Sequence, residues 1–181
     1  GLKCINPKLD MWVLPAWDCL PFDRLSPQGG LVGRRIETLA RICAGEAPSI
    51  LLTTINAIVQ KLPPADYLTD SSLVVSPASA HSPASLAEFL SDHSYLRTDT
   101  VRETGEFAIR GGIVDVFPPG YSDPVRLDFF GDEIETMRVF DAASQRSTGR
   151  LDRLVLRPVA EFMLTKANIS RFRTGYLEAF G

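Results

Sequence analysis

The sequence predicts an α+β, or mixed, fold in which an antiparallel β-sheet carries one helix and is joined to a partial α/β layer. Extended segments separated by tight-turn dipeptides fill residues 95–140, which is typical of an antiparallel sheet. Upstream, residues 31–62 alternate between helix, buried strand and helix, as an α/β layer does. Charge separates the two regions as well, because residues 1–64 carry a net +2 and residues 65–181 a net −5, which together give −3.

The first region, residues 1–64, is predicted to be an incomplete α/β fragment with too few strands for a full sheet. A short buried strand ends at Pro15, and the apolar run at 49–54 suits a second buried strand. Thr54 can cap a helix over 55–62, which the double proline that follows would end. This region therefore resembles one corner of a larger α/β domain.

Between these two strands, the segment 31–43 predicts an amphipathic helix, because its apolar residues recur with a period of 3.6. Four charged residues of this helix are expected to lie largely outside: Arg34, Arg35, Glu37 and Arg41. With Arg24, the three arginines make this segment the better candidate for a nucleic-acid contact, since residues 97–138 carry five arginines against nine acids. A solvated helix face explains the same arginines without a ligand.

The second region, residues 65–160, is predicted to be an antiparallel α+β module. Ser82 followed by Pro83 marks the start of its helix, which runs to His93. Gly-Gly at 111–112 and Gly-Asp at 131–132 are hairpin dipeptides. The predicted strands are 72–76, 95–101, 106–110, 112–117, 125–130, 133–140 and 154–159. A last helix, capped by Thr165 and running to residue 180, would fill residues 161–181 and begin the return to the α/β domain.

The register of the second hairpin predicts which residues are exposed. A two-residue turn at 131–132 pairs Phe130 with Glu133, Asp128 with Glu135 and Arg126 with Met137. Because side chains alternate between faces, one face then holds the apolar residues and the other holds the charged ones. Arg126 is expected to relieve the repulsion between Asp128 and Glu135.

Phe130 is the unusual member of the charged face. An aromatic side chain beside an arginine on a rigid sheet is typical of an interface hot spot, whereas a lone exposed phenylalanine is also common. Arg110 stands at the entrance of the first hairpin, where its charge can remain solvated. The sequence leaves both interpretations of this face open.

The sequence contains no recognisable catalytic constellation. His81 and His93 lack a cysteine partner at metal-binding spacing, and neither a phosphate-binding loop nor a nucleophile elbow occurs. Three cysteines at irregular spacing predict free thiols in a reducing compartment. The net charge of −3 gives no general attraction to nucleic acid, and no apolar run approaches the ~20 residues that span a membrane.

Long stretches of the chain carry a family resemblance. YLRTDTVRETGEFAIRGGIVDVFP, followed by RLDFFGDEIETMRVFDAASQRS, resembles the N-terminal region of bacterial transcription-repair coupling factors, the Mfd family. The upstream stretches LPAWDCLPFDRLSP, RIETLARI and LLTTINAIVQKLPP are similar to the same family. The excision-repair protein UvrB contains the same module and is the sister family. UvrB, however, has a tyrosine-rich segment leading to a hairpin insertion where this chain has AWDCLPFDRLSP.

The resemblance implies a UvrB domain-2-like module that binds UvrA, the damage-recognition ATPase of nucleotide excision repair. The family's contact residues match Arg110, Arg126 and Phe130 here, with Asp128 as the acidic residue between the last two. Further partners implied for the longer protein are RNA polymerase, DNA and its own C-terminal part, which would mask the site. No membrane partner is implied.

The resemblance also implies that this chain is not an enzyme. The longer protein looks like an ATP-dependent DNA translocase whose motor, with its ATP and Mg²⁺, lies outside these residues. No catalytic residue, cofactor or metal is therefore expected here, and the implied location is the bacterial cytoplasm. A fragment of a UvrB-type subunit and a direct DNA-binding module remain the alternative functions.

Overall fold

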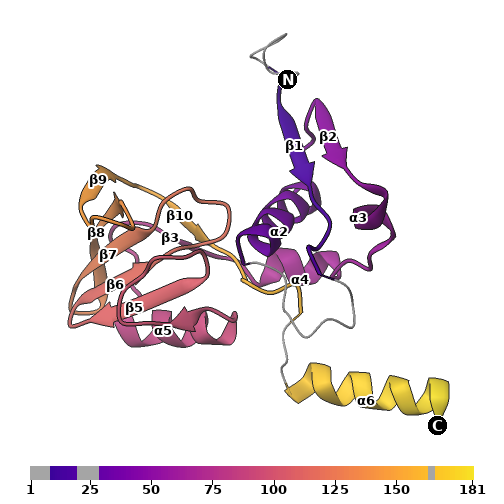
Figure 1. The fold of residues 1–181 in the computed structure, drawn as a ribbon. Helices are drawn as coiled ribbons and strands as arrows, with labels where there is room; N and C mark the ends of the chain where they lie inside the picture. Colours follow the sequence, from indigo (N-terminus) through magenta and orange to yellow (C-terminus); the bar gives the residue numbers. More distant parts are fainter. Residues whose placement is uncertain (1–8, 20–28, 163–165) are drawn as a thin grey trace.

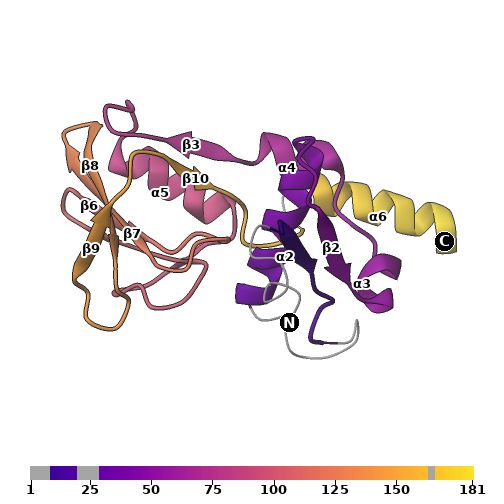
Figure 2. The same cartoon turned by 90° about the horizontal axis from the view of Figure 1, so that it is seen from above.

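The structure, a computed structural model, describes residues 9–19, 29–162 and 166–181. Two lobes lie side by side and are joined by two antiparallel strands, β3 and β10 (Figures 1 and 2). The N-terminal lobe contains β1 (Met11–Leu14), α2 (Gly29–Cys43), β2 (Ile50–Thr53), α3 (Ile55–Val59) and α4 (Ala65–Asp70). The C-terminal helix α6 (Lys166–Phe180) lies apart from the sheet lobe (Figure 1).

The second lobe is built on a six-stranded sheet with the strand order β4-β5-β6-β7-β8-β9. Its elements are β3 (Leu73–Val75), α5 (Pro83–Asp92), β4 (Leu96–Arg97), β5 (Glu106–Arg110), β6 (Ile113–Val116), β7 (Val125–Phe130), β8 (Glu133–Phe140), β9 (Ser147–Arg150) and β10 (Leu154–Leu156). All neighbours in this sheet are antiparallel except β4 and β5, which are parallel. The predicted α+β fold with one helix on an antiparallel sheet is confirmed.

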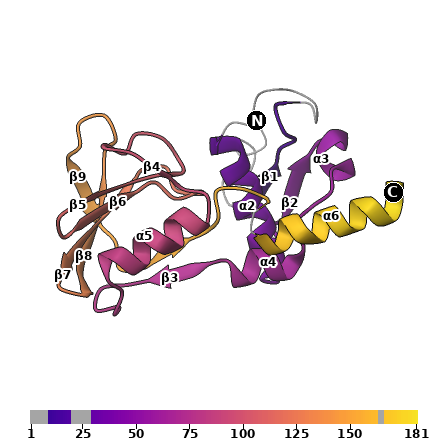
Figure 3. The same ribbon diagram turned by 90° about the horizontal axis from the view of Figure 1, so that it is seen from below.

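Helix α5 covers one face of the sheet, which we call the inner face (Figure 3). Helix α5 begins where the sequence predicts. Ser82 Oγ accepts a hydrogen bond from the Ser85 amide, and Pro83 occupies the first turn. Leu86 and Leu90 of the helix are fully buried in the core of this lobe. The inner-face residues in that core include Phe107, Val114, Val116, Val125, Leu127, Ile134 and Met137.

Both predicted hairpins are present. Arg110 pairs with Ile113 across the Gly-Gly turn, and Phe130 pairs with Glu133 across the Gly-Asp turn. The first turn residue has a positive φ in each case, 59° at Gly111 and 62° at Gly131. Glycine adopts this conformation without the clash that a Cβ would introduce, so the turn chemistry fixes these hairpins locally.

The predicted register of β7 and β8 is correct next to the turn and wrong beyond it. A β-bulge between Asp128 and Phe129 shifts the pairing by one, so Asp128 lies opposite Thr136 and not opposite Glu135. The shift places Met137 opposite Leu127, and both side chains are buried. Without the bulge, a threonine would face the core in place of Met137, which gives the physical reason for the correction.

The N-terminal lobe packs the buried side of α2 against β1, which pairs in parallel with β2, and against α4. Thr54 caps α3 as predicted, but the helix ends at Val59, earlier than expected. Neither α4 nor β9 was predicted. Thr165, the expected cap of α6, lies outside the described residues.

The expected exposure of Arg35 is wrong, because its side chain is completely buried. Its guanidinium donates hydrogen bonds to the carboxylate of Glu161 and to the carbonyl oxygen of Pro15. Trp17 donates to the same carboxylate at 3.0 Å from Nε1 to Oε1. Arg35 therefore fastens α2 to the segment that follows β10, and a charge can be buried there because its counter-charge is buried with it.

Gly105 provides a test of how closely the segments around the sheet pack. Its φ is 93°, and a Cβ at this position would lie 2.7 Å from Cγ1 of Val159. We expect Gly105→Ala to lower the free energy of unfolding by about 2 kcal/mol, since backbone strain and a clash combine. Gly111→Ala, where φ is also positive but the space is open, should cost only about 1 kcal/mol. Equal losses in urea titrations of the two variants would contradict the close contact.

Candidate functional site

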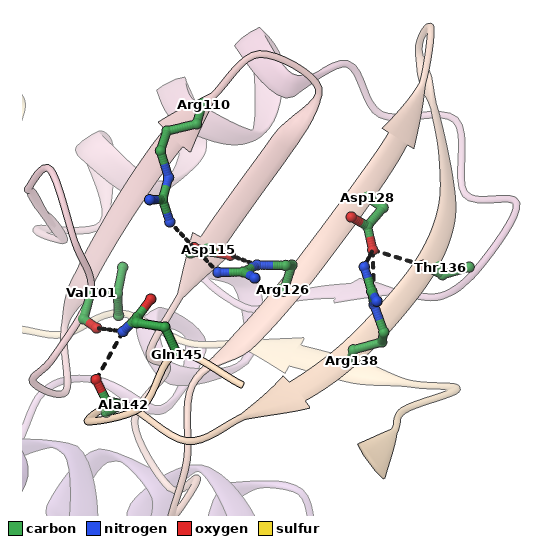
Figure 4. Close-up of polar contacts among 9 residues, drawn as sticks. All are labelled: Val101, Arg110, Asp115, Arg126, Asp128, Thr136, Arg138, Ala142 and Gln145. Atoms are coloured by element: carbon green, nitrogen blue, oxygen red, sulfur yellow. Dashed lines mark hydrogen bonds and ion pairs between the residues drawn. The ribbon is translucent and has the colours of Figure 1, made fainter. Parts of the chain in front are cut away.

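The outer face of the sheet, opposite α5, carries a group of mostly charged side chains that form two hydrogen-bonded clusters, one around Asp115 and one around Asp128 (Figure 4). We call this group, together with Phe130, the arginine face; it consists of Arg110, Asp115, Arg126, Asp128, Phe130, Thr136 and Arg138. These residues come from the four central strands β5 to β8, which are paired along their lengths. The backbone that holds the group is therefore a regular sheet and not a loop.

Asp115 is the centre of the arginine face. Its side chain is only 1% exposed, and its two oxygens accept hydrogen bonds from both flanking arginines. Arg110 donates from Nη2 at 2.8 Å, while Arg126 donates from Nε at 2.6 Å and from Nη2 at 2.8 Å (Figure 4). One buried carboxylate thus fixes the positions of two guanidinium groups.

Arg110 and Arg126 differ in how much of the guanidinium group remains accessible to a partner. The side chain of Arg110 is 52% exposed and makes one hydrogen bond to Asp115, so most of its N–H donors face solvent. The side chain of Arg126 is 18% exposed and packs over the ring of Phe140, with 4.8 Å between Cζ and the ring centroid. The hydrogen bond to Asp115 raises the pKa of Arg126 above its usual value, so its charge is fixed.

Asp128 has a different partner from the one expected. The sequence predicted that Arg126 would neutralise it, but Arg138 does so, donating from Nη2 at 2.7 Å and from Nε at 3.1 Å. Thr136, which the bulge places opposite Asp128, donates its hydroxyl at 2.8 Å. The register shift explains the correction, because it brings Arg138 directly opposite Arg126 on the outer face.

Phe130 ends β7 next to the turn, and 81% of its surface is exposed. It is the most exposed large apolar residue of the described chain. The neighbouring Phe129 points the other way and packs against the core. The inner and outer faces predicted for β7 are thus correct, and an aromatic ring stands free at one end of the arginine face.

Asp115 and Arg138 were not identified from the sequence as site residues. The alternation in IVDV places Asp115 on the face opposite Val114 and Val116, and the hairpin register places it beside Arg110. Extending the strand-pairing argument to β6 would therefore have found Asp115. Arg138 depends on the bulge, for which the sequence gives no local signal.

The described arginines of helix α2 do not form an open basic surface. Arg35 is buried, and Arg41 is paired with Glu46 at 2.8 Å and stacked on the ring of Trp12 at 3.8 Å. Arg34 is exposed, while Arg24 lies outside the described residues. The three described arginines of those suggested for DNA, Arg34, Arg35 and Arg41, therefore do not act as one free group.

No cluster of three or more metal-ligating side chains occurs in the residues that the structure describes. Cys43 is a free thiol, as expected, and Cys4 lies outside those residues. Within the same ranges, none of the helices is both long and apolar enough to cross a membrane.

A small sheet that carries fixed arginines and an exposed aromatic ring on one face has the composition of a protein-interaction domain. The comparison with family models agrees with that class. Residues 73–162 match the UvrB interaction domain, and this part of the chain belongs to that family.

Relatives extend the similarity to most of the chain. The transcription-repair-coupling factor of Escherichia coli is 35% identical over 167 residues, which is 92% of this chain and 14% of the relative. Those of Rickettsia bellii and Myxococcus xanthus are 32% and 36% identical over 97% and 84% of this chain, which is 16% and 13% of each relative. The similarity therefore covers one segment of each of these transcription-repair-coupling factors, and the chain spans only a small part of their length. The family resemblance predicted from the sequence is confirmed.

Proposed function

We propose that this chain is the protein-binding module by which a transcription-coupled DNA repair factor recruits UvrA to stalled RNA polymerase. The observation that carries the proposal is the arginine face, in which buried Asp115 holds Arg110 and Arg126 on the same side of the sheet as the exposed ring of Phe130. Guanidinium groups fixed in position bind carboxylates with two hydrogen bonds, and an aromatic ring fills an apolar pocket. The family and the relatives support this choice of partner.

The proposed role of the chain is binding and not catalysis. Every ion pair of the arginine face lies within the sheet, and none is arranged around a nucleophile or a base. ATP, Mg²⁺, DNA and RNA polymerase belong in this proposal to other parts of the longer protein. Masking of the arginine face by another segment of that protein would make recruitment of UvrA conditional on engagement with the polymerase.

Purified UvrA and the isolated chain test the function directly. We expect a saturable complex in a binding titration, and the absence of any complex at micromolar concentrations would contradict the proposal. The same titration with duplex DNA in place of UvrA tests the alternative function, direct binding to DNA. The affinity for DNA bound through its phosphates would fall steeply with salt, by about one logarithmic unit per phosphate contact for each tenfold rise in salt concentration.

Arg110 gives a test of the site that does not depend on the fold. Because its side chain is half exposed and makes a single hydrogen bond, Arg110→Ala should leave the melting temperature nearly unchanged. We expect the Kd for UvrA to rise about tenfold or more, as for an interface arginine. Arg173→Ala, a change of the same type at an exposed position of α6, is the control and should bind normally. Equal affinities of the two variants would remove Arg110 from the site.

A further inference from the structure

The strand register places three arginines in one line across the outer face. Arg126 on β7 lies directly opposite Arg138 on β8, and Arg138 lies directly opposite Arg150 on β9. Directly opposed residues share a face, so the line extends the arginine face to the last strand of the sheet. Arg150 was not among the residues that the sequence suggested for binding.

The first two arginines of this line are neutralised and the third is not. Asp115 pairs with Arg126, and Asp128 pairs with Arg138. Arg150 is exposed, as is the whole of β9, and it has no carboxylate partner within the ranges that the structure describes. The side chain of Arg138 is 41% exposed, so its remaining donors are also accessible.

Because Arg126 and Arg138 are each paired with a carboxylate, the uncompensated charge of this line is that of Arg150, which repels Arg138 directly opposite it. A serine or threonine at the position of Arg150 would relieve this repulsion and suit a strand equally well or better. A local arrangement that lowers stability without compensation is expected at functional sites. The position of Arg150 is therefore better explained by a ligand than by folding.

The opposite end of the outer face has the opposite charge. Asp132, Glu133 and Glu135 are exposed at and beside the β7–β8 turn, close in sequence to Phe130. A phosphate backbone lying along the face would meet these carboxylates, so a nucleic acid fits poorly. A protein surface can place an apolar pocket over Phe130 and carboxylates over the arginines, which matches both ends.

We propose that the docking surface continues from Phe130 across β8 to β9, and that Arg138 and Arg150 contact an acidic segment of the partner protein. This inference rests on the proposed function, because it concerns the same partner, UvrA. Arg150 lies at the rim of the surface, so its charge acts mainly on the rate of association and on its salt dependence.

The test compares Arg150→Glu with Arg34→Glu in stopped-flow or surface-binding kinetics with purified UvrA. Both positions are exposed and both substitutions reverse the same charge, but Arg34 lies on α2 in the other lobe. We expect Arg150→Glu to lower the association rate about three- to tenfold at low salt, with a smaller effect at about 0.5 M salt. Dissociation should change little, and Arg34→Glu should behave like the unchanged chain.

A thermal melt of the same variants separates binding from folding. Because the new carboxylate faces Arg138, Arg150→Glu should melt at or above the temperature of the unchanged chain while it associates more slowly. An unchanged association rate, or equal slowing by Arg34→Glu, would overturn the extension to β9. Phe130→Ala serves as the reference: if it abolishes binding while Arg150→Glu does not slow association, the proposed function stands and only the extension fails. If Phe130→Ala binds normally, Phe130 is rejected as the anchor, whereas the absence of any complex between UvrA and the unchanged chain would contradict the proposed function itself.

Discussion

Replacing Phe130 with alanine is expected to abolish detectable binding of UvrA and to leave the stability of the chain unchanged. The ring is 81% exposed, so its removal takes away almost no buried surface and opens no cavity. In a complex, the same ring would lose its contact with water and become the apolar centre of the interface. Truncating such an anchor costs about 2–4 kcal/mol, which corresponds to roughly a 30- to 1000-fold rise in Kd.

An exposed aromatic residue elsewhere on the surface is the control for non-specific apolar binding. Phe172 on α6 is 71% exposed, and Phe172→Ala removes the same ring from a position far from the sheet in sequence. We expect this variant to bind UvrA as the unchanged chain does. Isothermal titration at equal protein concentrations measures both. Early melting of Phe130→Ala would place the ring in the core, and normal binding would reject it as an anchor.

The parts of the fold that follow from local chemistry could be predicted from the sequence. Ser82 and Thr54 cap their helices through hydrogen bonds to amides three residues away. The hairpins follow from Gly111 and Gly131, whose backbone conformations disfavour any other residue. All four features depend only on neighbours in the chain, which is why a single sequence contains enough information.

The features that were predicted wrongly depend on distant parts of the chain. Arg35 has the pattern of an exposed helix residue, and its burial results from Glu161, which lies 126 residues further along. The bulge at Asp128 results from competition between a continuous ladder and the burial of Met137. Neither the distant carboxylate nor the depth of the core is visible in a local pattern.

The candidate site divides in the same way. Phe130 and Arg126 followed from the alternation of β7, which the bulge does not change. Asp115 could not be recognised in the same way, because a single acidic residue within an apolar strand has no evident role in the sequence. Its role follows only when its partners on β5 and β7 are placed beside it. The sequence therefore predicted the groups that would touch a partner more readily than the group that holds them in place.

Asp115 is the residue whose loss should have the second large effect, on stability and on binding together. Asp115→Ala would remove the acceptor of three hydrogen bonds and leave Arg110 and Arg126 as uncompensated neighbouring cations. Breaking a fully buried pair costs about 3–5 kcal/mol, and the partial exposure of the arginines reduces the expected loss here to about 2–4 kcal/mol. Urea unfolding measures this change in the free energy of unfolding.

A loss of binding by Asp115→Ala has meaning only if it exceeds what reduced stability causes. Leu86→Ala is the matched control, because it opens a cavity under α5, on the inner face, and should cost about 2–5 kcal/mol. The affinities of both variants for UvrA are measured at a temperature where circular dichroism shows each variant to be folded. If Asp115 positions the arginine face, the affinity of Asp115→Ala for UvrA is at least about tenfold lower than that of Leu86→Ala. The reason is that the guanidinium groups of Arg110 and Arg126 are no longer held in place. Equal affinities would mean that Asp115 serves the fold alone, and that Arg110 and Arg126 find their positions on the partner without it.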